Sequence, residues 1–138
     1  MGRTGSLLEI LQEKNCYEDV LESGVVFIDV TLSDYLQELI ASKNLKKSEV
    51  IFRSGLDRTY AYQIFSGAKK PTRDKLLALA IGMHLTFDEV QRLLKVNGYA
   101  QLYPKSRRDS IVVFAIYKGQ NILELNDRLL LMGERVLM

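Results

Sequence analysis

The sequence predicts an all-α protein, and three observations support this fold class. Apolar residues recur at helical spacing from residue 33 onward, as along residues 33–42. Residues that favour helix N-termini precede several of these stretches, and glycine follows several of them. The strand-like run at residues 25–28 has no partner strand in an otherwise helical chain.

Composition favours one soluble domain with a core of its own. The chain has 138 residues, of which 47% are hydrophobic and 26% are charged. No apolar run approaches the roughly 20 residues that a membrane helix needs. The N-terminus lacks the basic and apolar regions of a secretion signal. We therefore expect a cytoplasmic protein without membrane contact.

The chain offers little for catalysis or metal binding. Cys16 and His84 are the only cysteine and histidine, so there is no internal disulfide and no Cys/His metal set. No nucleophile is paired with a base, and no glycine-rich phosphate loop is present. These features predict a binding protein that is not an enzyme and has no cofactor.

Charge is distributed unevenly along the chain. Residues 1–30 contain two basic and six acidic side chains, a net charge of −4. Residues 43–75 contain nine basic and three acidic side chains, a net charge of +6. The basic segment is either a solvated face or a surface that binds phosphate groups. The acidic residues are either solvated or shield that surface until a partner displaces them.

Helices can be assigned in order along the chain. A short helix is expected over residues 6–14, followed by an irregular arm to residue 30. The clear helical pattern begins with residues 33–42 and continues with residues 48–54. The Ser-Gly-Leu sequence at residues 54–56 then breaks the helix, and this spacing sets the next helix across it at a steep angle.

Local signals define the next three helices. Asp57 suits the N-cap of a helix to about residue 66, and Gly67 suits the left-handed conformation after it. Pro71 separates this helix from the next, at residues 73–83. A capping box at residues 86–89 opens a helix to about residue 96, and His84 has a structural role before it.

The C-terminal part resembles an earlier part of the chain after a shift of 35 residues. Residues 73–98 then align with residues 108–133 at seven identical positions, which include Arg-Asp at both starts. The match is either a true duplication or the shared pattern of capped helices. Both interpretations predict two more helices, at residues 108–117 and 122–132, stacked on the hairpin before them.

Residues 33–96 resemble the phage-repressor-like helix-turn-helix family, the Cro and repressor type of DNA-binding domain (XRE family). The resemblance is carried by Ser54-Gly55-Leu56, Gly67, Lys70-Pro71-Thr72 and the spacing to the capping box. It implies a five-helix helix-turn-helix domain over residues 31–100. Residues 1–30 would then be an N-terminal helix and arm, and residues 101–138 an additional C-terminal helical hairpin.

By this resemblance, residues 57–66 form the recognition helix of a sequence-specific transcriptional regulator that binds double-stranded DNA. Arginine can pair with guanine and glutamine with adenine, while the threonine methyl can contact thymine. The expected base contacts are Arg58, Thr59, Tyr62 and Gln63. The expected phosphate contacts are Lys46, Lys47, Tyr60, Lys69, Lys70 and Arg73.

A homodimer is expected, because one helix-turn-helix reads only a half-site. The C-terminal hairpin is the expected dimer surface, since its apolar residues exceed what one helix pair can bury. These residues are Ile111, Val112, Val113, Phe114, Ile116, Leu123, Leu125, Leu129, Leu130 and Leu131.

Three residues depart from the family pattern and leave a protein partner open. Ile51 stands where the family has alanine at a close helix contact, so it requires wider packing or a compensating small residue such as Ala61. Phe52 and Phe65 stand at positions that are often polar, and they would be exposed unless another element covers them. The alternative function is a protein-interaction adaptor of the same fold. Its aromatic surface would comprise Phe52, Tyr60, Tyr62 and Phe65.

Overall fold

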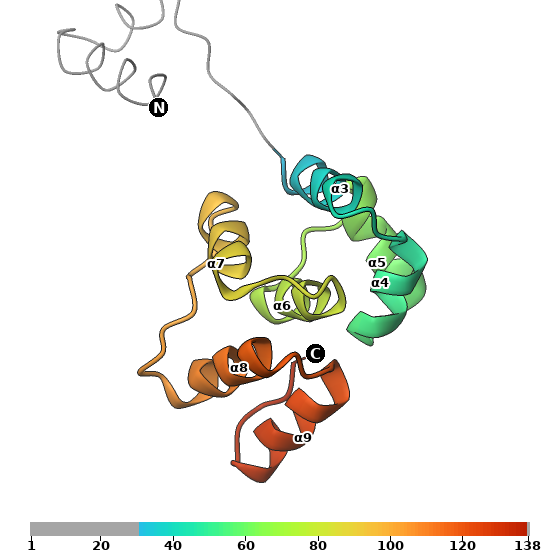
Figure 1. Cartoon of the computed structure of the whole chain (residues 1–138). Helices are drawn as coiled ribbons and strands as arrows, with labels where there is room; N and C mark the ends of the chain where they lie inside the picture. Colours follow the sequence, from blue (N-terminus) through green and yellow to red (C-terminus); the bar gives the residue numbers. More distant parts are fainter. Residues whose placement is uncertain (1–30, 138) are drawn as a thin grey trace, which may run out of the picture.

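The computed structural model describes residues 31–137 and is all-helical over that range (Figure 1). Within it, the seven helices are α3 (Leu32–Ser42), α4 (Lys47–Ser54), α5 (Arg58–Ser66), α6 (Arg73–Gly82), α7 (Phe87–Val96), α8 (Arg107–Lys118) and α9 (Ile122–Leu131). The predicted all-α class is confirmed for these residues. The helix and arm predicted for residues 1–30 lie outside the described part. None of the described helices is long and apolar enough to cross a membrane.

Local capping signals set the helix ends as predicted. The Asp57 carboxylate accepts a backbone N–H of the first turn of α5 at 3.0 Å. Thr86 and Glu89 form the two reciprocal bonds of a capping box at the start of α7. Gly67 and His84 have φ angles of 89° and 55°, in the left-handed region that ends helices.

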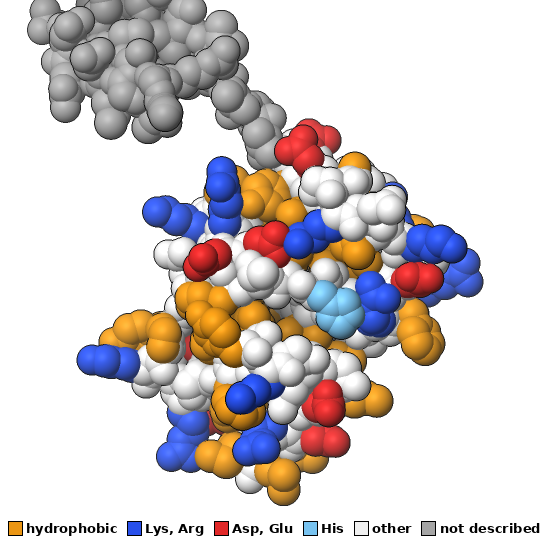
Figure 2. All heavy atoms as spheres, in the orientation of Figure 1, with side chains coloured by type: hydrophobic (Ala, Val, Ile, Leu, Met, Phe, Trp, Pro, Cys, Tyr) orange, Lys and Arg blue, Asp and Glu red, His pale blue; other side chains and the backbone are white. Residues whose placement is uncertain are grey.

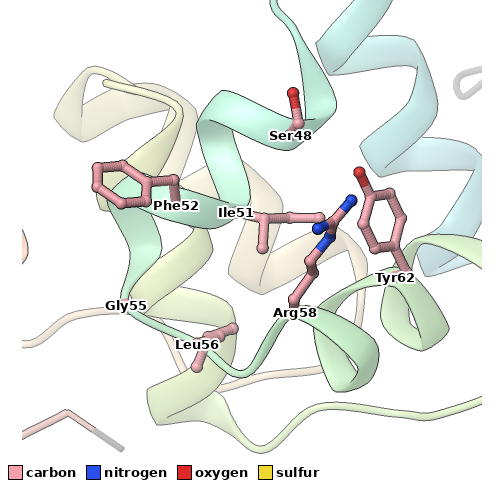
Figure 3. Close-up of a pocket in the computed structure, with 7 residues that line it drawn as sticks. All are labelled: Ser48, Ile51, Phe52, Gly55, Leu56, Arg58 and Tyr62. Carbon is pink, nitrogen blue, oxygen red and sulfur yellow. The ribbon is translucent and has the colours of Figure 1, made fainter.

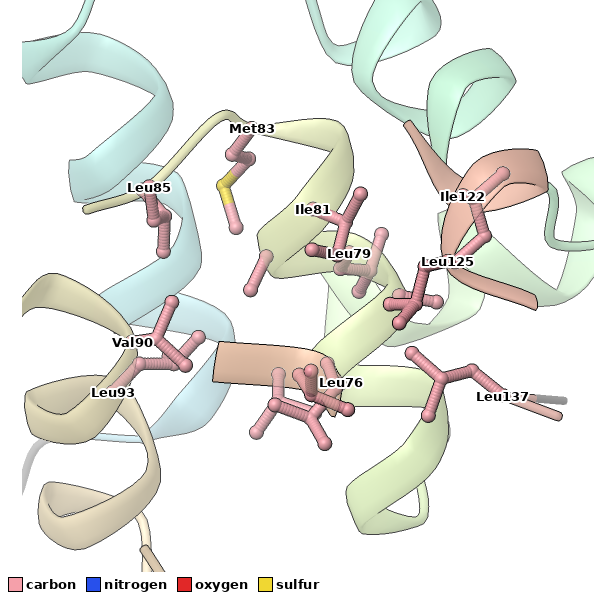
Figure 4. Packing of buried hydrophobic residues seen from close by; sticks show 14 of the residues in the cluster. Leu76, Leu79, Ile81, Met83, Leu85, Val90, Leu93, Ile122, Leu125 and Leu137 are labelled. Atoms are coloured by element: carbon pink, nitrogen blue, oxygen red, sulfur yellow. The ribbon is translucent and has the colours of Figure 1, made fainter. Parts of the chain in front are cut away.

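Helix α6 lies at the centre of the fold, between α4, α7 and the C-terminal helices (Figure 1). Residues 76–82 are all buried, so α6 has no polar face along this stretch. Figure 4 shows side chains of α6, α7 and α9 meeting in one apolar cluster, with Leu137 beside them. Elements from both halves of the chain therefore build a single core.

Helices α4 and α6 cross at close range at Gly82. A Cβ atom added to Gly82 would lie 2.5 Å from the Val50 carbonyl oxygen, so a larger residue would push the helices apart. Arg53 strengthens the crossing by donating from Nε to the Gly82 carbonyl oxygen at 2.9 Å. Ile51 is accommodated beside it and is 3% exposed. The small residue that permits the close approach of α4 and α6 is thus Gly82 of α6. Ala61, the small residue that the sequence suggested, is buried in α5.

The 35-residue repeat is present in the hydrogen bonds of the structure. The Gln91 side chain bonds to both backbone polar groups of Leu102, and Asn126 bonds to Leu137 in the same way. Capping boxes open both α7 and α9, again at positions 35 residues apart. Residues 73–102 and 108–137 are therefore structural repeats, named here the first and the second repeat.

Reciprocal ion pairs join the two repeats. Arg73 donates to both carboxylate oxygens of Asp109, at 3.1 and 2.9 Å. Arg108 donates to both carboxylate oxygens of Asp74, at 2.9 and 3.0 Å. Each repeat thus makes the same contact with the other, as in a two-fold interface. The two repeats form a closed pair and not the start of a longer stack.

Each of these arginines also holds the extended segment that ends its own repeat. Arg73 donates to the backbone carbonyls of residues 100 and 101. Arg108 donates to those of residues 135 and 136. Because a guanidinium is planar and always charged, it can hold a carboxylate and two carbonyls together at the repeat interface.

The second repeat buries part of its apolar residues within the chain. Four of the ten apolar residues of the expected dimer surface are buried within the chain, because α8 and α9 pack on each other and on the first repeat. The buried residues are Ile111, Val112, Leu125 and Leu129. Four others are exposed by 45 to 82%, namely Phe114, Leu123, Leu130 and Leu131. The apolar surface left for a partner is thus formed mainly by these four exposed residues.

Asp109 is the more buried acid of the two ion pairs. Its side chain is 11% exposed, against 23% for Asp74. Burial alone raises the pKa of the Asp109 carboxyl, but hydrogen bonds from Arg73 and from the Tyr103 backbone N–H bring the pKa below its ordinary value. The fold therefore stabilises the ionised form.

We expect Asp109→Asn to lower the free energy of unfolding by about 2–3 kcal/mol, because Arg73 then loses its counter-charge in a half-buried site. Asp74→Asn should cost less, since Asp74 is more exposed and Asp109 accepts an additional hydrogen bond from the Tyr103 backbone N–H. Urea unfolding followed by circular dichroism measures both changes. Glu38→Gln removes an exposed acid of α3 and is the control. Equal losses in all three variants would contradict the role of the ion pairs.

The lowered pKa of Asp109 also predicts a loss of stability in acid. A carboxyl whose pKa is lower in the folded state stabilises the fold above its unfolded pKa, which is about 3.9 for aspartate. This stabilisation decreases as the pH falls through the folded pKa, because the unfolded chain then binds the proton more readily. The stability difference between wild type and Asp109→Asn should therefore shrink from about pH 7 to about pH 3. A constant difference in urea unfolding across this range would refute the linkage.

Candidate nucleic-acid interface

A short turn with fixed geometry joins α4 and α5. Gly55 has a φ of 74° and ends α4 in the left-handed conformation. The Ser54 hydroxyl donates to the Ile51 carbonyl oxygen at 2.6 Å and accepts the Leu56 backbone N–H at 3.2 Å. On the other side, Ile122 of α9 comes within 3.5 Å of a Cβ atom placed on Gly55. Its own hydrogen bonds and the second repeat therefore both support the turn.

Helix α5 is anchored to α3 at its C-terminal end. Ser33 and Gln37 of α3 both donate to the Phe65 carbonyl oxygen. Ala61 and Ile64 point into the core and are 0% and 1% exposed. The opposite face of α5 stays accessible along its first two turns.

The four predicted base contacts lie on this accessible face. Arg58 and Thr59 are exposed in the first turn, Tyr62 is 37% exposed, and Gln63 is half-buried. None of the four side chains hydrogen-bonds to another group within residues 31–137. Three of them line one shallow hollow together with Lys47 of α4. The structure thus brings unbonded polar groups of two helices to one surface.

Arg58 lies on the other side of Tyr62. Its guanidinium carbon is 5.9 Å from the centroid of the Tyr62 ring. Figure 3 shows Arg58 between Ile51 and Tyr62, in a second hollow whose lining also includes Phe52 and Leu56. This second depression, named the α4–α5 hollow, is mainly apolar apart from Arg58. Arg58 forms no salt bridge within residues 31–137, so its charge is available to a ligand.

Four lysines lie close to α5 in the sequence, two at the start of α4 and two after the end of α5. Lys46, Lys69 and Lys70 are exposed, and none of them forms a salt bridge among the described residues. Lys47 is half-buried with its Nζ 5.3 Å from the Phe65 ring centroid. Tyr60 is also half-buried and packs against the core. Lys47 thus lies beside the accessible face of α5, whereas Lys69 and Lys70 follow its C-terminal end and line a depression next to α3.

Arg73 has a structural role in place of the predicted phosphate contact. Its guanidinium donates to Asp109 and to the carbonyls of residues 100 and 101, which uses four of its five N–H groups. Asp109 neutralises its charge at 2.9 Å. The sequence alone does not indicate this role, because the two partners are 36 residues apart.

The two aromatic residues that depart from the family pattern have opposite environments. Phe65 is 1% exposed, because it lies on the face of α5 that packs into the core. The predicted aromatic surface is therefore wrong in its inclusion of Phe65. Phe52 is 85% exposed, and with Tyr62 it borders the α4–α5 hollow.

Two further residues belong to this surface and are absent from the predicted set. Gln37 of α3 lines the same hollow as Gln63. Lys75 of α6 places its Nζ 5.1 Å from the Tyr60 ring centroid. The basic segment of residues 43–75 is a sequence signal for Lys75. Gln37 has no such signal, because only the packing of α3 on α5 brings it to the surface.

Elsewhere the surface is mixed in character. On the face shown in Figure 2, basic side chains lie among acidic and hydrophobic ones. No group of three or more His, Cys, Asp or Glu in residues 31–137 could hold a metal ion.

A scan against protein-family models, a search of curated proteins and a search of solved structures found no match to the chain.

Proposed function

We propose that residues 31–100 form a repressor-like helix-turn-helix domain of the Cro and repressor type. Helices α3 to α7 are its five helices, and α4 and α5 are the two helices of the motif. The proposal is supported by the left-handed Gly55, by the Asp57 cap of α5 and by the anchoring of α5 on α3. The α8–α9 hairpin is an addition that completes the core of this domain.

We further propose that the chain is a sequence-specific DNA-binding transcriptional regulator, in which α5 reads a half-site in the major groove. One observation carries this proposal: α5 presents unbonded polar side chains on one face beside Lys47, and further lysines without salt bridges lie at the start of α4 and after the end of α5. Arg58 and Gln63 have the chemistry to read guanine and adenine, and Thr59 can contact a thymine methyl. The lysines supply binding to phosphates that does not depend on sequence.

Fluorescence anisotropy with a pool of DNA duplexes, measured across a salt series, tests this function. The affinity of the wild-type protein should fall steeply as salt increases, because binding releases counterions from DNA. On a duplex selected from the pool, Arg58→Ala and Gln63→Ala should each lose about 1–3 kcal/mol of base discrimination. Arg128→Ala, an exposed residue of α9, is the matched control. A chain that binds no duplex at low salt is not a DNA-binding regulator.

We propose that the regulator is a homodimer, which would read two half-sites related by two-fold symmetry. The exposed leucines of α9 are the proposed contact, because Leu123, Leu130 and Leu131 recur at helical spacing on one side of it. Leucine side chains exposed by 70% or more in such a row favour burial against a partner.

Replacing Leu130 and Leu131 together by serine should produce a monomer, because the contact then loses most of its apolar area. Sedimentation equilibrium at concentrations near the dissociation constant of the wild type measures the change. Val96→Ser, at a residue of α7 that is 51% exposed, is the control and should leave the dimer intact. A wild-type chain that sediments as a monomer at all concentrations would contradict the proposed contact.

A protein-interaction adaptor is the second proposal, and the α4–α5 hollow favours it. Phe52 is 85% exposed at the edge of this mainly apolar depression, and an exposed phenylalanine next to apolar residues is typical of protein contacts. The anisotropy experiment separates the two functions. No DNA binding at low salt by a folded dimer would favour the adaptor over the regulator.

A further inference from the structure

A basic hollow lies where the two repeats meet, away from the four predicted base contacts on α5. Thr72, Arg73, Asp74 and Lys75 of the first repeat line one side of it. Arg108 and Arg135 of the second repeat line the other side. Four cations and one acid therefore face the same depression.

The charges in this hollow do not cancel. Asp109 neutralises Arg73, and Asp74 neutralises Arg108, through the two reciprocal ion pairs. Lys75 and Arg135 form no salt bridge within residues 31–137. Two positive charges are therefore left over, one contributed by each repeat.

One basic residue, Lys75, connects the hollow to the start of α5. The Lys75 Nζ lies 5.1 Å from the ring centroid of Tyr60, in the first turn of α5. The same lysine lines the hollow together with Arg135. Lys75 therefore lies between the first turn of α5 and the hollow that the segment after α9 helps to line.

The backbone of Arg135 is fixed by hydrogen bonds from other residues of the second repeat. Its carbonyl oxygen accepts a hydrogen bond from Nε of Arg108 at 2.9 Å. The next residues are fixed by Arg108 and Asn126, which bond to the backbone of Val136 and Leu137. The Arg135 side chain itself is exposed, so its charge points from a well-anchored segment towards solvent.

We propose that Lys75 and Arg135 extend the DNA contact beyond the helix-turn-helix and bind phosphates of the backbone that flanks the half-site. This inference rests on the proposed DNA-binding function and adds the second repeat to the interface. Neither residue contacts bases, so together they increase affinity at all sequences without a change in base preference. Each side chain contributes about 0.9 to the slope of log affinity against log salt.

The test uses Lys75→Gln, Arg135→Gln and the double variant in the full chain, with a duplex selected by the wild type. Glutamine keeps a long polar side chain and removes the charge. The salt slope should decrease by about one unit for each charge removed per protomer, while discrimination between selected and altered duplexes stays unchanged. Lys75→Arg should retain the wild-type slope. Arg128→Gln, which removes an exposed charge of α9 that does not line the hollow, should also retain it.

Hydroxyl-radical footprinting on the wild type provides a second measurement. The wild-type protein should protect backbone positions outside the half-site, and the double variant should lose that protection only. A double variant with the wild-type slope and footprint overturns the proposal that Lys75 and Arg135 bind DNA phosphates. The proposed DNA-binding function is then kept if Arg58→Ala still loses base preference. A wild type that binds no DNA overturns both proposals. Thermal unfolding of each variant verifies that the protein is folded.

Discussion

Helix α6 has no polar face between Leu76 and Gly82, and the rest of the fold is arranged to cover it. Complete burial of one leucine side chain contributes about 1.5–3 kcal/mol, so an uncovered side of this helix would be costly. Helix α4 covers one side at Gly82, and α7 covers another. The second repeat covers the remainder, with Leu125 and Leu129 fully buried. Residues 101–137 therefore belong to the same core as the helices before them.

The reciprocal ion pairs explain how two copies of one motif close on each other. Asp74 and Asp109 each lie in the first turn of their own helix, where the helix dipole favours a negative charge. Each carboxylate also accepts two bonds from the arginine of the other repeat. The Arg-Asp dipeptide thus supplies both halves of the contact, and a two-fold arrangement satisfies both copies at once. A linear stack would leave one arginine and one aspartate without partners.

The sequence predicts local structure well in this chain, because its signals act over a few residues. The Asp57 cap, the capping box at residues 86–89 and the left-handed His84 all occur as expected. Errors arise where partners are distant in the sequence. Arg73 has the charge of a phosphate contact, but it pairs with Asp109. Phe65 departs from the family pattern, but it faces the core. Such outcomes depend on how helices pack, which periodicity and charge alone do not specify.

Packing also determines how much freedom the candidate reading surface retains. Its turn is fixed by the Ser54 hydroxyl and backed by Ile122, and the end of α5 is bonded to α3. The backbone of α5 is therefore ordered before any ligand binds, and binding has to fix side chains only. This lowers the entropic cost of recognition, which is largest when loops must be ordered on binding. Since Ile122 belongs to the second repeat, that repeat lies against the turn between α4 and α5, so the α8–α9 hairpin also limits the space into which this turn can move.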